Sequence, residues 1–429
     1  MNYLHQIWNT PTLRKKILFT LMILIIFRMV AHITIPGVDA SGIQSVFEQN
    51  ALLGVFSALT GGSMESFSIV LMGLAPYINA SIIIQLMTVV IPHLEQLSKE
   101  GEEGRKKLNK YTRWLTLPLA FLQSYGMIIL LNNSALASGS PLLDTSSFVN
   151  MLPVMISITA GTIFAMWLGE VISEKGIGNG ISLLIFAGIV SAIPPIFGRI
   201  LGVSQYDPSK LPAFFGFCIF TLLLLVLIAL FTEAYRNVPI TYASRGSQAQ
   251  KSALPLRLNQ AGMIPIIFAI AMITFPALIA QIMSTAESEG AKNVASWINT
   301  YLNTANPGYV YILLYFFLVL GFAYFYVSIV FKPEQVAENI QKRGGFIPGI
   351  RPGPETADYL DKTSMNLTFW GGTFLAGIAI LPLLFTKYTS LQASDLIITG
   401  SGLIIVVGVV LELIRQVNAQ LVAHDYDKI

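Results

Sequence analysis

The sequence predicts an all-α polytopic membrane protein with ten transmembrane helices, and three observations predict this class. Of the 429 residues, 54% are hydrophobic and only 11% are charged, whereas soluble domains carry about a quarter charged residues. The chain also contains repeated apolar runs of about 20 residues, the length that crosses a bilayer core about 30 Å thick. In addition, basic residues gather in alternate loops, as the positive-inside rule predicts for membrane proteins.

The ten predicted spans differ in how well they suit a lipid environment. They are residues 17–35, 71–91, 114–131, 151–171, 181–199, 213–235, 262–283, 309–331, 367–386 and 396–414. The second is interrupted by Pro76, Asn79 and Gln85, and the seventh by Pro265 and Pro276. Such residues are tolerated at membrane depth where neighbouring protein or a water-filled cavity satisfies them. We therefore expect these two segments to line a cavity.

Basic residues indicate the orientation of the chain. Most of the 26 basic residues fall at the two ends of the chain or in the loops on the same side. The loops on the other side contain only Arg199, Lys210, Lys292 and Lys387. This asymmetry predicts that both termini are cytoplasmic. The first apolar run follows basic residues, as in a secretory signal, but no small-residue cleavage pattern follows it, so we interpret it as a retained first helix.

The sequence contains no pattern typical of an enzyme, a metal centre or a cofactor site, so we expect none of these. The phosphate-binding pattern G-x-x-x-x-G-K-[ST], the H-E-x-x-H pattern and the G-x-S-x-G pattern are absent, and the four histidines are scattered. The glycine-rich run 176–180 lies between two apolar segments, which indicates a tight, flexible interhelical turn. The single cysteine, Cys218, lies in an apolar run and is interpreted as inert packing.

Charged residues near the apolar segments leave alternatives open. Arg28 lies inside the first span, where it either makes a polar contact within the bundle or extends to the lipid headgroups. Glu170, Glu233 and Glu412 lie near predicted cytoplasmic helix ends and could extend to the surface. No acidic or histidine relay occurs at mid-depth, which argues against an ion-coupled carrier. The loops 236–261 and 332–366 are either docking loops or ordinary positive-inside loops.

Four long stretches of the sequence are distinctive, namely GLAPYINASIIIQLMTVVIP (73–92), EGEEGRKKLNKYTR (100–113), MWLGEVISEKGIGNGISLLIFAGIV (166–190) and FIPGIRPGPETADYLDK (346–362). Each of them resembles the SecY family, the large subunit of the protein-conducting channel of the bacterial inner membrane. The resemblance runs in order along nearly the whole chain and includes LPLRLNQAGMIPIIFA (254–269). Collinear matches of this length are more specific than any short motif.

The resemblance implies two pseudo-symmetric inverted halves around a central hourglass pore. The N-terminal half is 1–199, the connection 200–212 acts as a hinge, and the C-terminal half is 213–429 with the docking loops 236–261 and 332–366. A lateral gate is expected between the second and seventh spans. The implied function is a passive channel that moves unfolded secretory polypeptides across the membrane and releases transmembrane segments sideways into lipid.

The resemblance also implies the functional residues. The pore ring would be formed by Leu74, Ile78, Ile185, Ile189, Ile267 and Ile405. A short plug helix would occupy residues 56–70, with Phe56, Gly61, Gly62, Phe67 and Val70. Docking would use Arg245, Lys251 and Arg351, although the 236–261 loop has a shorter and less basic tip than is usual in the family. Leu74 stands where isoleucine is common, a change that nearly conserves volume.

The partners implied are SecE-like and SecG-like membrane subunits, a SecA motor ATPase or the ribosome, signal sequences and nascent polypeptides, and the lipid bilayer. No nucleotide site is visible, so a partner must supply the energy. Two other function classes stay open from the residues alone. A small-solute transporter built on inverted repeats predicts a polar midplane site, for which only Asn79, Gln85 and Arg28 are candidates. A membrane-embedded enzyme predicts paired catalytic residues at depth, and the sequence contains none.

Overall fold

Each predicted span coincides with a helix of the protein. The computed structural model describes residues 3–35, 66–137, 148–204, 210–242, 250–284, 288–302, 308–388 and 399–426. The matching helices are α2 (Pro11–Val30), α5 (Ala75–Val90), α7 (Glu102–Ala137), α8 (Phe148–Lys175), α9 (Gly180–Ser204), α10 (Lys210–Glu233), α11 (Ile264–Ser284), α13 (Tyr309–Val330), α15 (Pro354–Tyr388) and α16 (Gly400–Tyr426).

The helices differ in their capacity to cross a membrane alone. Among the described residues, six helices are long and apolar enough by length and composition, namely α7, α8, α10, α13, α15 and α16. Helix α5 forms a bent pair with α6 (Pro92–Lys99), at an angle of 103°. The apolar parts of α9 and α11 are shorter and end at Pro195 and Pro276. Helix α2 carries a basic cluster in its first turns and Arg28 in its last turn.

Several helices continue past the apolar runs that identified them. Helix α7 begins at Glu102 and α15 begins at Pro354, each about a dozen residues before the predicted span. Hydropathy detects only the part of a helix that matches the bilayer core, so the polar extension of each helix was counted as loop. The extension of α15 occupies the C-terminal part of the expected loop 332–366.

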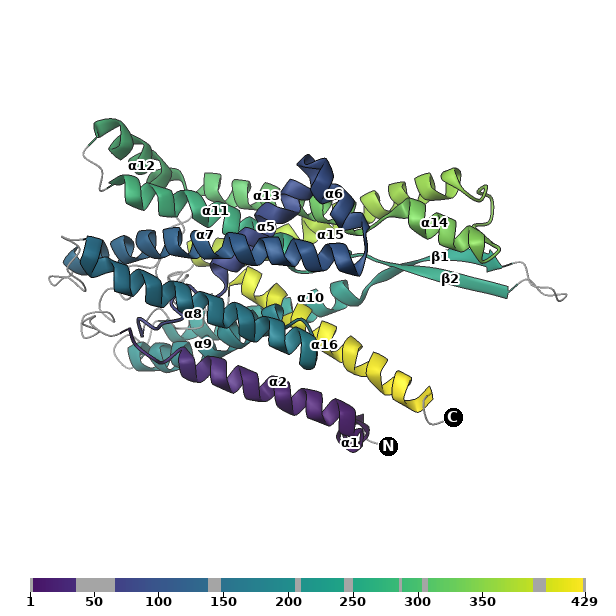
Figure 1. Cartoon of the computed structure of the whole chain (residues 1–429), viewed down its shortest axis with the longest axis horizontal. Helices are drawn as coiled ribbons and strands as arrows, with labels where there is room; N and C mark the ends of the chain where they lie inside the picture. Colours follow the sequence, from purple (N-terminus) through teal and green to yellow (C-terminus); the bar gives the residue numbers. More distant parts are fainter. Residues whose placement is uncertain are drawn as a thin grey trace.

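A small sheet lies beyond one end of the helices, and the sequence did not predict it. Strands β1 (Tyr235–Tyr242) and β2 (Gln250–Arg257) pair antiparallel, and the two-residue strand β3 (Gly345–Phe346) joins β1, in the order β2-β1-β3. The helix α14 (Pro333–Lys342) packs beside it. In Figure 1 the sheet and α14 project at the same end of the bundle as α1 (Tyr3–Asn9) and the last turns of α16.

Apolar side chains form a large core between the helices and a separate small core under the sheet. The large core draws buried residues from α2, α8, α9, α10, α11, α13, α15 and α16, together with Val70 and Leu74 before α5. The small core joins Val238 and Ile240 of β1 to Ile340 of α14 and Leu360 of α15. The sheet is therefore packed against the extension of α15 and is held to the helical bundle by a continuous helix.

The glycine-rich run forms a tight turn between α8 and α9, as expected, and hydrogen bonds hold it; its flexibility stays a prediction. The backbone N–H of Gly180 donates to Ser173 Oγ at 2.8 Å, and that of Ile177 donates to Thr20 Oγ1 of α2 at 3.1 Å. Asn179 Oδ1 accepts from the N–H groups that begin α9. Gly178 has a φ of +85°, which glycine adopts readily. The turn sets where α9 begins, and with it the position of Ile185.

Replacing Gly180 with alanine should lower the amount of folded protein in the membrane severely. A Cβ at this position would lie 1.9 Å from the backbone oxygen of Gly169 and 2.7 Å from Cβ of Ile172. Because both neighbours belong to α8, the two helices would have to separate; overpacking of this kind typically costs about 1–3 kcal/mol or more. Quantitative immunoblotting of membranes measures the effect.

Gly216→Ala on α10 is the matched control, because a Cβ there meets no atom within 4 Å. We expect it to accumulate normally. Equal membrane levels of Gly180→Ala and Gly216→Ala would contradict the close packing of α8 on α9.

Candidate functional site

An apolar cavity of about 110 Å³ lies within the helical bundle, among helices distant in sequence. Helices α5, α7, α9, α11 and α16 contribute to its walls, together with Phe27 of α2. Five of the six predicted ring residues line it: Leu74, Ile78, Ile185, Ile267 and Ile405. These residues come from both predicted halves of the chain. The structure therefore brings together residues separated by more than 300 positions.

Ile189 is the predicted ring residue that does not line the cavity. It is 6% exposed and packs in the large core. On α9 the cavity is lined instead by Leu184, Ile185 and Gly188. The side of α9 that lines the cavity is thus rotated slightly about the helix axis, so that it includes residue 185 but not residue 189. The role of all six residues as a pore ring stays a prediction.

The chemistry of the cavity wall is that of a dewetting constriction. None of its lining residues carries a charge, most are apolar, and isoleucine is the commonest type among them. A narrow apolar passage disfavours water and therefore ions. It also offers few directional contacts that would select one passing molecule over another. The local sequence favours this arrangement, because α5 begins at Ala75–Pro76, which leaves Leu74 just before the first turn.

A buried amide lies at the cavity wall without a hydrogen-bond partner among the residues that the structure describes. It belongs to Gln123 of α7, which is 6% exposed and lines the cavity, and neither its Nε2 nor its Oε1 is paired within that part of the chain. Asn79 and Thr274 also line the cavity, from α5 and α11. The hydroxyl of Thr274 donates to the backbone oxygen of Ile270 at 2.8 Å. An unpaired buried amide costs about 1–3 kcal/mol, so this conformation carries an unsatisfied polar group where α5, α7 and α11 meet.

Sequence reasoning identified Asn79 but missed Gln123. The available signal was a lone glutamine in the apolar run LAFLQSYGMIILL of the third span. Gln85, which was identified instead, donates from Nε2 to Ser81 Oγ at 3.0 Å and does not line the cavity. Only the packing of α7 against α5 and α11 distinguishes the two glutamines.

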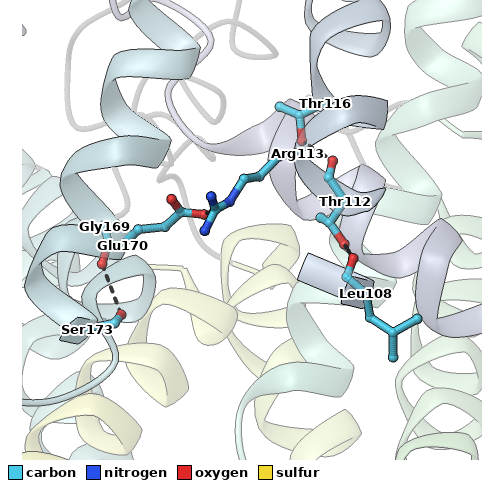
Figure 2. A network of polar contacts seen from close by, with 7 residues as sticks. All are labelled: Leu108, Thr112, Arg113, Thr116, Gly169, Glu170 and Ser173. Atoms are coloured by element: carbon cyan, nitrogen blue, oxygen red, sulfur yellow. Dashed lines mark hydrogen bonds and ion pairs between the residues drawn. The ribbon is translucent and has the colours of Figure 1, made fainter. Parts of the chain in front are cut away.

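An ion pair joins α7 and α8 near the ends that face the sheet. Nε of Arg113 lies 2.6 Å from Oε1 of Glu170, and Figure 2 shows the two side chains pointing toward each other from different helices. The carboxylate is only 25% exposed. Glu170 is therefore not simply extended toward the surface, which was one expectation from the sequence. A second interhelical pair, Arg415–Glu233 at 2.5 Å, joins α16 to α10.

The described part of the predicted plug is not helical. Residues 66–74 form turns, and an isolated β-bridge joins Ser68 to Thr34 after α2. Phe67 has a φ of +43° and is 2% exposed, and Val70 is fully buried. The backbone groups of Phe67 and Ile69 are used by the bridge, so a helix cannot continue through them. Phe56, Gly61 and Gly62 lie outside the described residues.

The predicted docking residues fall at the sheet end of the molecule. Arg351 is exposed in the turn between β3 and α15, between Gly349 and Gly353, whose φ values are +83° and +106°. Its backbone oxygen accepts a hydrogen bond from Thr356 Oγ1 at 2.8 Å, which fixes the turn. Lys251 belongs to β2 and pairs with Thr241 of β1. Arg245 lies outside the described residues.

The sequence and the structure both match known proteins. The SecY family model matches residues 68–414. The protein translocase subunit SecY of Bacillus subtilis is 41% identical, with 96% of each chain covered, and that of Streptomyces scabiei is 40% identical, with 98% of this chain and 97% of the relative covered.

Two solved structures share the fold. "The structure of a protein conducting channel" matches with a TM-score of 0.67 at 18% identity and covers 94% of this chain and 91% of that one. "Sec61 in the Canine ribosome-channel complex from the endoplasmic reticulum" matches with a TM-score of 0.65, at the same identity and coverage. The fold is thus that of a predominantly helical, multi-pass membrane channel, and the chain belongs to the SecY family.

Proposed function

We propose that the chain is a passive protein-conducting channel, which translocates unfolded secretory polypeptides and releases transmembrane segments sideways into lipid. The observation that carries the proposal is the uncharged apolar cavity lined by Leu74, Ile78, Ile185, Ile267 and Ile405. A constriction of this kind seals the resting membrane against ions by excluding water. It accepts unrelated polypeptides because it lacks a fixed pattern of charges. Relatives that match over nearly their full length are named protein translocase subunits.

The two halves of the channel would be 1–199 and 213–429, joined by a hinge at 200–212. Helices α5 and α9 belong to the first half, and α11 and α16 belong to the second. Helix α5 contacts α11, and the cavity lies between them. Separation of α5 from α11 would therefore open the cavity toward lipid, as a lateral gate requires. A signal sequence would favour this state by binding it more tightly than the closed state.

The energy for transport would come from a partner on the cytoplasmic side. We place both termini, the sheet and Arg351 on that side of the bacterial inner membrane, because the basic loops lie there. The partner would be a SecA-like motor or the ribosome, and one structural match is a ribosome–channel complex. SecE-like and SecG-like subunits would complete the assembly. The channel itself would form and break no covalent bond.

Reconstitution tests the proposed function. The chain, with its small membrane partners, is incorporated into proteoliposomes, and a motor, ATP and a radiolabelled precursor are added. We expect the precursor to become protected from external protease only when the chain, the motor and a functional signal sequence are all present. Absence of protection in vesicles that contain correctly inserted chain and active motor would contradict the proposal.

Replacing Gln123 with leucine should stabilise the closed channel. The substitution removes the unpaired amide from the cavity, and each ~1.4 kcal/mol gained by the closed state lowers the open population about tenfold. In the open state, water or the passing chain would pair with the amide, so the open state gains nothing from the change. Export of a precursor with a weakened signal sequence should therefore fall about tenfold, as measured by pulse-chase processing.

Gln85→Leu is the matched control, because that amide is already paired and lies outside the cavity. It should leave export of the same precursor unchanged. Increased export in Gln123→Leu would show that the unpaired amide does not oppose closure.

A further inference from the structure

The helix α12 (Glu289–Tyr301) follows the gate helix α11 and carries two apolar faces, although the helix itself is too short to span a membrane. It begins with Glu289 in the first turn, where a carboxylate suits the positive end of the helix dipole. In Figure 1 it lies at the end of the bundle opposite the sheet and α1. Nothing in the channel mechanism uses it.

One apolar face of α12 is packed against the protein. Ala295 is 1% exposed, and Ile298 is partly buried one turn further along. Helix α12 makes most of its contacts with α11. This face is enough to hold α12 in place on the end of α11.

The second apolar face points away from the protein. Val294, Trp297 and Tyr301 are 47%, 58% and 43% exposed, and their spacing of three and four residues puts them on one side of the helix. At about 100° per residue, this side lies about a quarter-turn from the packed face. The opposite side carries only polar or charged side chains, including Lys292, Ser296 and Asn299. The helix is therefore amphipathic beyond what its contact with α11 requires.

The helix that α12 packs against also carries an exposed apolar stripe. On α11, Met272, Phe275 and Ile279 are exposed at the same spacing of three and four residues, and in a multi-pass membrane protein such a stripe faces lipid. The aromatic rings of Trp297 and Tyr301 contact each other, with centroids 5.2 Å apart. Tryptophan and tyrosine are enriched at the level of the lipid headgroups, where one end of each ring is apolar and the other is wet.

We propose that α12 is an interfacial helix, whose face of Val294, Trp297 and Tyr301 inserts into the headgroup region of the leaflet on the side opposite the sheet. The lipid bilayer itself covers this face. The polar side of the helix faces water, and the packed side holds α11. Helix α12 therefore anchors the end of α11 at a fixed depth in that leaflet. The inference requires only that the chain is embedded in a membrane, so it stands independently of the transport activity.

Site-directed spin labelling of the full chain, reconstituted with its partners in liposomes of phosphatidylethanolamine and phosphatidylglycerol, tests this placement. Cys218 is replaced by serine, and single cysteines are introduced at Val294 or Trp297 on the exposed apolar face. The matched controls are cysteines at Ser296 or Asn299 on the polar face of the same helix. Collisions of each label with oxygen, which concentrates in lipid, are compared with collisions with a water-soluble nickel complex.

We expect labels at 294 and 297 to collide more with oxygen than with the nickel complex, and labels at 296 and 299 to show the reverse order. Equal access of the nickel complex to both faces would overturn the proposal, because the helix would then be surrounded by water. Protection of 294 and 297 from both reagents would also overturn it, because protein rather than lipid would cover the face.

Discussion

Replacing Ile405 with asparagine should raise the ion conductance of the resting channel about tenfold or more. Ile405 is 1% exposed in the large core and lines the cavity from α16. An amide placed there without a partner costs about 1–3 kcal/mol, and water that enters the cavity relieves this cost. Each ~1.4 kcal/mol shifts the ratio of wet to dry states about tenfold. Single-channel or vesicle-leak recordings in planar bilayers or proteoliposomes measure the effect.

The same substitution should increase export of precursors with poor signal sequences, because a destabilised closed state needs less binding energy to open. Ile405→Val is the matched control, since it removes one methyl group and adds no polar atom; such changes cost about 0.5–1.5 kcal/mol. We expect Ile405→Val to stay close to the wild type in both assays. Wild-type conductance in a stably inserted Ile405→Asn variant would remove Ile405 from the seal.

Reversal of charge at Arg351 should reduce transport driven by the motor or the ribosome about tenfold or more, while the chain still inserts normally. Arg351 is exposed, and no interaction of its guanidinium group holds the fold together among the described residues; the turn is held by the hydrogen bond from Thr356 to the backbone. A reversed charge at a docking surface turns attraction into repulsion and weakens association. Proteoliposome transport and co-sedimentation with the motor or ribosomes measure the effect.

Arg343→Glu is the matched control for Arg351→Glu. Arg343 is also exposed and lies at the C-terminal end of α14, in the same loop 332–366. The Arg343→Glu substitution changes the net charge of that surface by the same amount as Arg351→Glu. Any difference in transport between the two variants therefore depends on position. Equal loss of transport in both variants would mean that the surface acts only through its total charge.

The helices were predictable from the sequence because the signal that defines them is local. A run such as FCIFTLLLLVLIALF in α10 needs no partner to indicate a membrane helix. The ends of the helices were less predictable, since the polar first turns of α15 are stabilised by packing of Leu360 under the sheet. The sheet was missed because β1 and β2 each contain a proline, Pro239 and Pro255, which weakens the sequence signal for a strand.

The site was predictable only in part, because its geometry depends on contacts between distant helices. The apolar residues around the cavity were identified through the family resemblance, and Ile189 fell outside the cavity because the rotation of α9 is set by the turn before Gly180. Gln123 and the Arg113–Glu170 pair carry no local pattern. Their positions follow from the way α7 packs against α5, α8 and α11. The spacing of residues along the sequence does not predict this packing.

The most direct test of the central claim is a cross-link between a passing polypeptide and the cavity. Cys218 is replaced by serine, one cysteine is introduced at Ile185, and a secretory precursor with a single cysteine is stalled during transport. We predict a disulfide between the precursor and residue 185 that depends on the signal sequence and on the driving partner. Active transport without this disulfide would place the path of the polypeptide outside the cavity lined by Ile185, and so contradict our account of the constriction.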